Sequence, residues 1–374
     1  MNLPPSPFPE KHAMPRSARP RILALAALAL ASGAAQAQLS QSQSSCVHEY
    51  ADCLAMTSRG LSDLRQRGTI VAPLVAIGES LAQGRRSAGA QPRLAGLGGR
   101  APALAATGGE TGLAGAARGA RWNTWASIGQ TQLDYEWQPL RSGGDVNNAV
   151  LGLDYRWSDK ATVGVSLAFD ETKIATTFNS GRLTGDGVNV TPYLGYQFDP
   201  NWSLDAALGM GRAKSQSVDN SFGSITGNST SNRAFGSASL NYSRWVGNWE
   251  FSGKAMLVQT EERTSQYTLS NGQVVQGSAQ RLSQARLGAQ VGYVAAEGLN
   301  PFVGLAYVND LHRPTQTNPL GFRTNPANDR DGWVLSGGLN FIGKGALSGG
   351  VLLTAEDRRE QKQASIMANI AVRF

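Results

Sequence analysis

Alternation of apolar with small or polar residues recurs over the last two thirds of the chain and constrains the fold more than any other feature. It is clearest in residues 151–157, 163–170, 202–211, 284–293 and 333–341. Within residues 163–170, for example, the odd-numbered positions are Val, Val, Leu and Phe. Side chains on a strand point to opposite sides in turn, so each segment predicts a strand with one apolar face. The chain from Trp122 to Phe374 is therefore predicted to be all-β.

The apolar faces can pack inward, as in a soluble sandwich, or face lipid, as in a membrane barrel. The opposite faces are rich in glycine and charge, which suits a lumen, and 44 of the 374 residues are glycine. Charged residues make up 16% of the chain, below the ~25% of an ordinary soluble protein. No run of 18 apolar residues occurs after Trp122, so no transmembrane helix is predicted there. These features favour a transmembrane β-barrel.

Connections of two lengths alternate along this region. Short turns are predicted at 158–160, 199–201, 246–248, 295–300 and 343–345. Longer polar loops are predicted at 136–147, 171–185, 214–232, 260–279 and 309–330, with a tight hairpin near 358–361. Five short turns interleaved with six outer connections define twelve antiparallel strands. Because outer-membrane barrels have short periplasmic turns, both ends of the barrel domain are expected in the periplasm.

Aromatic residues gather near the short turns. The predicted girdle consists of Tyr155, Trp157, Tyr196, Phe198, Trp202, Trp245, Trp249, Tyr293 and Phe341. Amphipathic rings prefer the headgroup level of a membrane, whereas a packed core would not collect them at one end.

Residues 1–37 have the features of a secretory signal peptide. Arg16, Arg19 and Arg21 precede an apolar run, and Ala35-Gln-Ala37 provides a cleavage site before Gln38. Either Met1 or Met14 can be the start, and the short, Ala-rich apolar run argues against an anchor helix. An exported protein meets no nucleic acid, so the formal charge of +7 predicts contact with lipopolysaccharide or a pore lining instead.

Two further segments precede the barrel. Residues 38–83 carry a weak helical pattern that Gly60, Gly68 and Pro73 interrupt, so a partly helical segment is predicted rather than one long helix. Residues 84–121 are rich in Ala and Gly, which predicts a flexible or partly helical linker.

Cys46 and Cys53 are the only cysteines. An oxidising envelope favours a disulfide, although on one straight helix these residues lie ~10 Å apart, beyond disulfide reach. Either the two cysteines form a disulfide with each other that closes a small loop, or each thiol is paired elsewhere. His48 lies between them, but the spacing matches no zinc site, so no metal is predicted.

The final strand places Ile366, Ala368, Ile370, Val372 and Phe374 on one face, and the last residue is aromatic. This resembles the signature of bacterial outer-membrane barrels, which implies that the barrel-assembly machinery recognises Phe374. With residues 122–126 and 188–196 and the Gly-rich strands, the region 122–374 resembles the autotransporter β-domain of type V secretion.

The resemblance implies a monomeric barrel in outer-membrane lipid and lipopolysaccharide that carries its own N-terminal passenger to the cell surface. A linker, commonly helical, threads the lumen in this family, and residues 84–121 are the expected counterpart. The chain departs from the family because residues 38–121 are too few for a long β-helical passenger, and the linker lacks the asparagine pair of self-cleaving members. We therefore expect a translocator that displays residues 38–83 or is plugged by them. The alternative is a passenger-less barrel that acts as an adhesin or channel through its external loops.

Catalytic chemistry is not predicted, and no cofactor is implied. The three histidines, His12, His48 and His312, have no recognisable nucleophile beside them. Ser80 lacks an esterase motif, and Asp329, Asp331 and Glu356 are expected to be solvated loop acids.

Alternation instead directs seven charged residues into the lumen. They are Asp154, Arg156, Asp205, Glu250, Lys254, Arg286 and Arg373. These side chains are expected to pair with a threaded helix, to tune ion passage, or only to neutralise one another.

Overall fold

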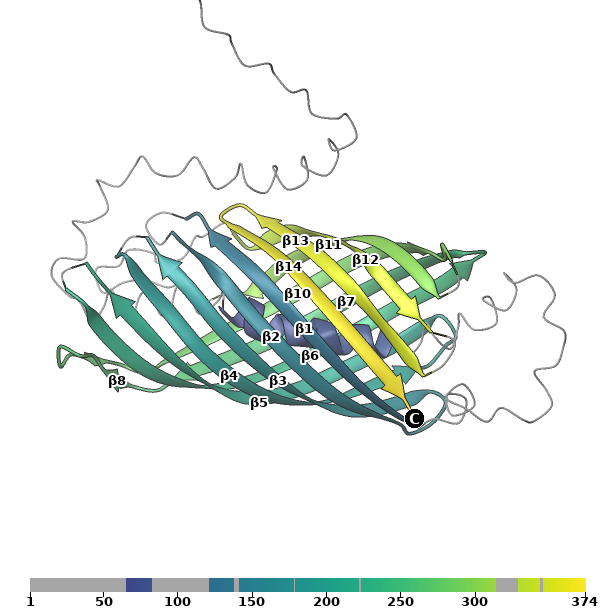
Figure 1. Cartoon of the computed structure of the whole chain (residues 1–374), viewed down its shortest axis with the longest axis horizontal. Coiled ribbons are helices and arrows are strands. Elements are labelled where there is room, and N and C mark those ends of the chain that lie inside the picture. The colour runs from purple at the N-terminus through teal and green to yellow at the C-terminus, as the bar shows by residue number, and fades with distance from the viewer. Residues whose placement is uncertain are drawn as a thin grey trace, which may run out of the picture. The chain divides into compact units, whose positions relative to one another are not determined.

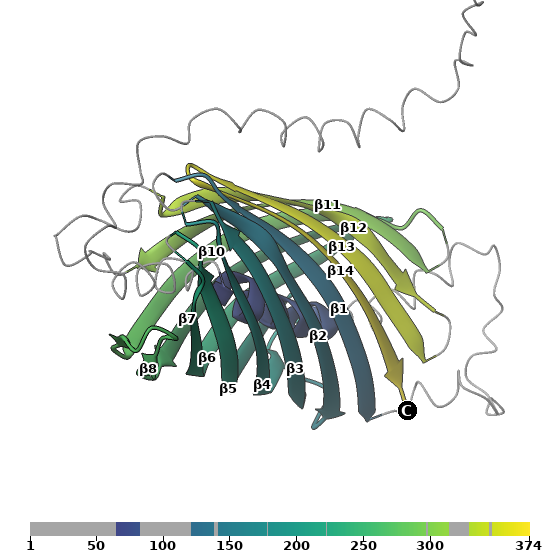
Figure 2. The same cartoon turned by 60° about the vertical axis from the view of Figure 1, so that its left-hand side comes forward.

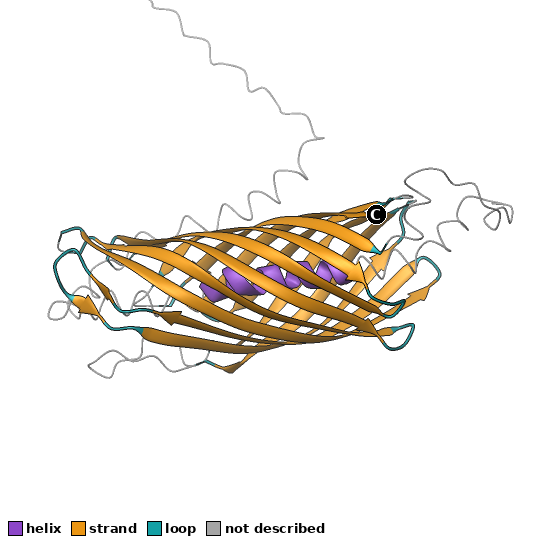
Figure 3. Cartoon of the chain, turned by 90° about the horizontal axis from the view of Figure 1, so that it is seen from below, coloured by secondary structure: helices purple, strands orange, loops and turns teal. Residues whose placement is uncertain are grey.

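The computed structural model describes residues 65–82, 121–137, 141–177, 179–221, 223–296, 298–313, 329–343 and 346–374. All of them belong to one compact unit, Glu49–Phe374. They form a closed antiparallel β-barrel around a helix, which is purple in Figure 3. The predicted signal peptide, Cys46, Cys53 and residues 84–120 lie outside the described residues.

Twelve strands close the barrel, as predicted, and each pairs with its neighbours around the ring (Figure 1). They are β1 (Trp122–Tyr135), β2 (Ser142–Arg156), β3 (Ala161–Thr176), β4 (Gly181–Gln197), β5 (Trp202–Asp219), β6 (Ile225–Val246), β7 (Trp249–Thr264), β10 (Ser278–Tyr293), β11 (Leu299–His312), β12 (Asp331–Ile342), β13 (Leu347–Arg358) and β14 (Gln361–Arg373). β1 pairs with β14 from Asn123↔Arg373 to Tyr135↔Gln361, which closes the ring. The short β8 (Tyr267–Thr268) and β9 (Val274–Val275) form a separate hairpin between β7 and β10.

The strands meet at two different ends. At the turn end, short connections join β2 to β3, β4 to β5, β6 to β7, β10 to β11 and β12 to β13. The opposite end is the loop end, and it carries the connections from β1 to β2, β3 to β4, β5 to β6, β7 to β10, β11 to β12 and β13 to β14. β1 starts and β14 finishes at the turn end.

Large apolar side chains cover the outside of the barrel. Leu208, Met210 and Leu287 are 71%, 67% and 66% exposed, and similar residues recur at alternate positions on every barrel strand. A water-soluble monomer rarely exposes so large a continuous apolar surface. The outer face is therefore the lipid-facing side, as the alternation predicted.

The inner face combines glycines with aromatic rings from the next strand. A Cβ atom at Gly152 would lie 2.1 Å from the ring of Trp125, and one at Gly209 would lie 2.1 Å from the ring of Phe235. Each pair is directly opposite in register. The missing side chain lets the ring lie against the neighbouring strand, which leaves the centre of the barrel for the helix.

The helix is continuous over residues 65–82, and it contains a π-helical segment, η2 (Arg67–Val71). The predicted interruption at Gly68 and Pro73 is therefore wrong. Pro73 has no N–H to donate, and the wider π turn immediately precedes it. A Cβ atom at Gly68 would lie 2.9 Å from the Val146 side chain, so glycine is needed for close packing against β2. Packing inside the barrel outweighs the local helix-breaking tendencies.

Several strands are longer at the loop end than the sequence predicted. Residues 171–176 belong to β3 and residues 214–219 to β5, although both stretches were predicted to be loop. Past the lipid neither face needs to be apolar, so the alternation disappears while the backbone pairing continues.

Candidate functional site

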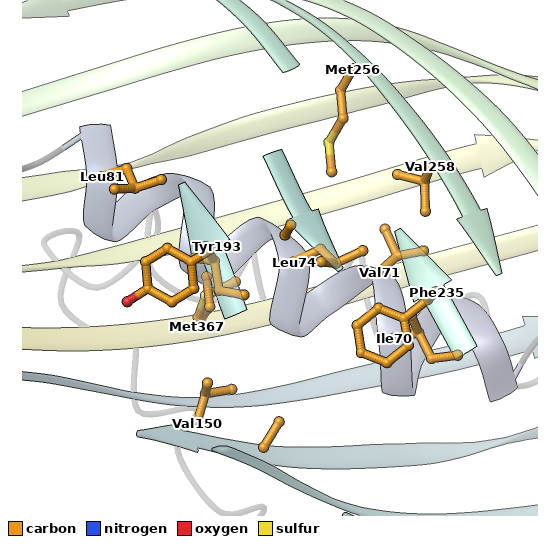
Figure 4. Close-up of a cluster of buried hydrophobic side chains, with 14 of the residues drawn as sticks. Ile70, Val71, Leu74, Leu81, Val150, Tyr193, Phe235, Met256, Val258 and Met367 are labelled. Atoms are coloured by element: carbon orange, nitrogen blue, oxygen red, sulfur yellow. The ribbon is translucent and has the colours of Figure 1, made fainter. Parts of the chain in front are cut away.

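The helix lies in the lumen and packs against many strands at once. Its apolar residues Ile70, Val71, Leu74, Ile77 and Leu81 are each at most 6% exposed. Figure 4 shows four of them among side chains that the barrel wall contributes, namely Val150, Tyr193, Phe235, Met256, Val258 and Met367. Figures 1 and 2 agree in placing the helix between the front and back walls of the barrel. This all-round burial, worth roughly 1.5–3 kcal/mol for each fully buried large side chain, explains why a short segment is helical here.

Arg67, near the helix N-terminus, enters a buried charge cluster. Its Nη2 lies 2.5 Å from Asp310 Oδ2, and its Nη1 lies 3.8 Å from Glu356 Oε1. Arg358 lies 3.3 Å from Asp310 and 2.6 Å from Glu356, and Arg286 lies 3.3 Å from Glu356. The helix thus supplies one of three cations to two carboxylates on β11 and β13.

Arg65 enters a second cluster on β3, β5, β6 and β7. It pairs with Glu262, and its Nη1 donates to Ser215 Oγ at 2.5 Å. Glu262 lies 3.7 Å from Arg233 Nε, and Arg233 pairs with Asp170 at 2.6 Å. Together the two arginines connect this part of the helix to four strands, β5, β7, β11 and β13.

These contacts fix the direction of the helix. Glu262, Asp310 and Glu356 each lie two residues before the loop end of their strands. Near the other end of the helix, a Leu81 methyl carbon lies 3.1 Å from the Cβ position of Gly195, close to the turn end of β4. The helix therefore runs from the loop end, where Arg65 lies, to the turn end, where Leu81 lies.

The carboxylates predicted to face the lumen at the turn end accept hydrogen bonds from neutral side chains on the barrel wall. Asp154 accepts hydrogen bonds from Asn123 (2.7 Å), Trp125 Nε1 (3.2 Å) and the Tyr193 hydroxyl. Asp205 accepts one from Asn241 at 2.8 Å. Glu250 accepts bonds from Ser243 at 3.2 Å and Asn300 at 3.0 Å. All three are at most 7% exposed.

The predicted luminal cations are distributed over both ends. Arg286 belongs to the Arg67 cluster. Lys254 lies beside the helix, with its Nζ 2.7 Å from the Cβ position of Gly78. Arg156 and Arg373 line a cavity of about 170 Å³ at the turn end, together with Leu81.

A larger cavity, about 440 Å³, lies beside the helix at the turn end. Gly78, Trp202, Tyr242, Glu250 and Lys254 line it. The part of the lumen around residues 78–82 is thus less tightly filled than the part around the two arginines.

Most aromatics of the predicted girdle lie on the outer face near the turn end. The ring of Trp202 packs against that of Tyr242 in a tilted arrangement (ring centroids 4.9 Å apart), and the ring of Trp249 packs in the same way against that of Tyr293 (4.8 Å). The other girdle residues near the turn end are Tyr155, Trp157, Tyr196, Phe198 and Phe341. Trp245 differs, because its side chain faces the lumen. It lies next to the outward-facing Val246 and, two residues after Ser243, points to the same side of β6 as that inward-facing serine. A lumen-side position does not fit a girdle.

Phe374 ends the chain beside the seam of the barrel. Its backbone N–H donates to the carbonyl of Trp122 at 3.0 Å, and its side chain is 58% exposed. Its recognition by the assembly machinery stays a prediction.

Two of the three acids expected to be solvated are buried instead. Glu356 lies on β13 and faces the charge cluster, and Asp329 is 0% exposed. Burial raises the pKa of the Asp329 carboxyl, although the Glu360 N–H donates to it at 3.1 Å. Within the described residues, no three His, Cys, Asp or Glu side chains are grouped so as to hold a metal ion. In the part of the chain that the structure describes, no helix is both long and apolar enough to cross a membrane.

The sequence pattern did not reveal the two helix arginines, Arg65 and Arg67, or their acidic partners Glu262 and Asp310. The parity of β7 could have placed Glu262 inside, because Leu257 on the same strand faces outward. Nothing comparable marked Arg65 or Arg67.

A closed barrel of twelve strands with an apolar outer face and a helix in its lumen defines an outer-membrane β-barrel. Residues 113–351 match the family model of the autotransporter β-domain, and the chain belongs to this family. No curated protein sequence matches the chain.

Three solved structures share the fold. The translocator domain of autotransporter NalP from Neisseria meningitidis has a TM-score of 0.59 at 11% identity, covering 80% of this chain and 98% of that one. The β-domain of the Bordetella autotransporter BrkA has a TM-score of 0.57 at 19% identity, covering 68% and 100%. The transport unit of AIDA-I from Escherichia coli has a TM-score of 0.52 at 12% identity, covering 78% and 98%.

Proposed function

We propose that this protein is a translocator barrel that displays its own N-terminal segment at the cell surface, with residues 65–82 left in the lumen as a plug. The single observation that carries the proposal is the direction of the helix. Arg65 lies at the loop end and Leu81 at the turn end, where β1 also begins. A chain that enters β1 from the periplasm and has threaded its N-terminal part outward has this direction.

The proposal includes the predicted segments that precede the barrel. Residues 1–37 act as the export signal, residues 38–64 lie outside the cell, and residues 83–120 return on the periplasmic side to Trp122. The protein works as a monomer without catalysis, in contact with lipopolysaccharide, after insertion by the barrel-assembly machinery. This differs from the expectation that residues 84–121 thread the lumen, because the luminal helix is formed by residues 65–82.

Protease treatment of intact cells tests the display. An epitope tag placed after Gln38 is expected to be removed, whereas the same tag in the turn at Ser158–Lys160 is expected to survive until the outer membrane is permeabilised. A tag placed between β11 and β12 serves as the positive control for cleavage at the loop end. If the protease removes this control tag but not the tag after Gln38, display is contradicted. Planar-bilayer conductance tests the plug, and deletion of residues 65–82 is expected to raise it.

A second candidate function is adhesion through the loop end. The β5–β6 hairpin extends past the apolar band and packs against β8 and β9 through Ile225, Tyr267, Leu269 and Val275. This small cluster gives the hairpin a defined shape for contacting another cell. Loss of cell binding on deletion of residues 266–276, with the N-terminal tag still exposed, would favour this alternative.

A further inference from the structure

The outer face of β5 changes from apolar to basic within one step of its alternation. Leu208 and Met210 are among the most exposed apolar side chains of the barrel, at 71% and 67%. The next two outward residues toward the loop end are Arg212 and Lys214, both exposed. Two residues of strand span about 7 Å, so both cations lie directly past the lipid-facing band.

These cations differ from three other outward-facing ones near the same end. Lys173 pairs with Glu171 at 2.7 Å, Arg281 pairs with Glu261 at 3.0 Å, and Lys362 pairs with Glu136 at 3.0 Å. Among the described residues, neither Arg212 nor Lys214 has an ion pair or a side-chain hydrogen bond.

The surroundings leave a net positive charge. Across the strand pairs, Arg212 faces Val188 and Asn232, and Lys214 faces Asp186 and Thr230. Arg182, on β4, is a third exposed cation nearer the loop end. On β4 and β5, three exposed cations therefore stand against one carboxylate, Asp186, while the neighbouring Glu171 on β3 is paired with Lys173.

We propose that Arg212 and Lys214, with Arg182 farther along, bind the phosphate groups of a phosphorylated glycolipid of the outer leaflet, whose acyl chains lie on Leu208 and Met210. The combination favours a lipid, because the cations directly follow the lipid-facing Leu208 and Met210 on the same face of β5, so one molecule with acyl chains and a phosphorylated headgroup contacts both. Arginine and lysine form charge-assisted bonds to phosphate oxygens. The inference rests on the orientation in the proposed function, which puts the loop end outside the cell.

Binding of purified bisphosphorylated lipid A to the full chain in non-ionic detergent tests the proposal. The variant Arg212→Gln with Lys214→Gln is expected to bind about tenfold more weakly, as the loss of a charge-assisted contact implies. The matched control is Arg263→Gln with Arg281→Gln, which removes the same charge from outward-facing residues that already pair with Glu261. The control is expected to bind as the unaltered protein does. Folding of each variant is checked by its heat-modifiable migration on gels.

Two further measurements separate the sources of binding. Arg212→Lys with Lys214→Arg keeps both charges and is expected to retain binding, and dephosphorylated lipid A is expected to bind the unaltered protein about as weakly as the glutamine variant binds lipid A. Equal weakening by both glutamine variants would overturn the proposal, and so would equal binding of phosphorylated and dephosphorylated lipid. Full competition by inorganic phosphate would show a soluble-anion site and overturn it as well. Failure of these tests leaves the exposure of a tag after Gln38 unaffected, so the two proposals are judged separately.

Discussion

Substitution of Arg67 tests what holds the helix in the lumen. Arg67→Gln removes a buried positive charge that lies 2.5 Å from Asp310 and 3.8 Å from Glu356. Removing one partner of an isolated buried ion pair costs about 3–5 kcal/mol. Arg286 and Arg358 continue to contact these carboxylates, so the expected loss is smaller, about 2 kcal/mol.

A loss of this size is measurable as a change in conductance. If the barrel conducts well only when the helix leaves the lumen, about 2 kcal/mol raises the ratio of open to filled barrels roughly thirtyfold. Single-channel recording in planar bilayers gives this ratio as the share of time spent at high conductance. Deletion of residues 65–82 defines the fully open level, and Arg281→Gln on the outer face provides the baseline.

The partners of Arg67 supply a second, independent check. In a double-mutant cycle, Asp310→Asn is expected to have a smaller effect in the Arg67→Gln background than in the unaltered protein, because the two groups interact directly. The idea that these ion pairs retain the helix would be refuted if Arg67→Gln left the share of time at high conductance unchanged while deletion of residues 65–82 raised it. Additive effects in the cycle would refute the direct interaction.

Three further predictions concern packing. Gly68→Cys with Val146→Cys should cross-link on oxidation, since a Cβ at position 68 lies 3.0 Å from that of Val146; gel migration without reductant reports it, and no cross-link would contradict the helix position. Gly152→Val should destabilise the barrel by about 1–3 kcal/mol in thermal or denaturant unfolding, whereas Gly253→Ala, with its nearest atom at 3.8 Å, should be nearly neutral; similar effects would contradict the ring packing. Tyr193→Phe should cost about 1–3 kcal/mol in the same assay, because a buried carboxylate loses a donor, and a neutral result would argue against that hydrogen bond.

The barrel was predictable wherever lipid imposes a pattern. Lipid requires one apolar face on each strand, so the sequence predicted all twelve strands and their short turns. Past the lipid the requirement ends, and residues 171–176 and 214–219 were taken for loops although they are paired strand. The continuous helix was also missed, because Gly68 and Pro73 break helices in water and are tolerated only by the packing inside this lumen.

The site was predictable only as far as local alternation reaches. The alternation of side chains along each strand placed Asp154 and Arg286 in the lumen, but it did not identify their partners. The pairs that hold the helix join residues 197 positions apart, Arg65 and Glu262, and 243 positions apart, Arg67 and Asp310. No local pattern encodes such pairs, since each is created by closure of the barrel around the helix.

The two kinds of contact made by the helix have different consequences for its position. Apolar side chains such as Leu74 and Ile77 lie among apolar neighbours from many strands, and a shift by one helical turn, about 5.4 Å, would exchange one apolar contact for another. The same shift would draw Arg65 and Arg67 away from Glu262 and Asp310 and leave buried charges without partners, which is far more costly. Apolar burial therefore accounts for the presence of the helix in the lumen, and the ion pairs at the loop end account for its register.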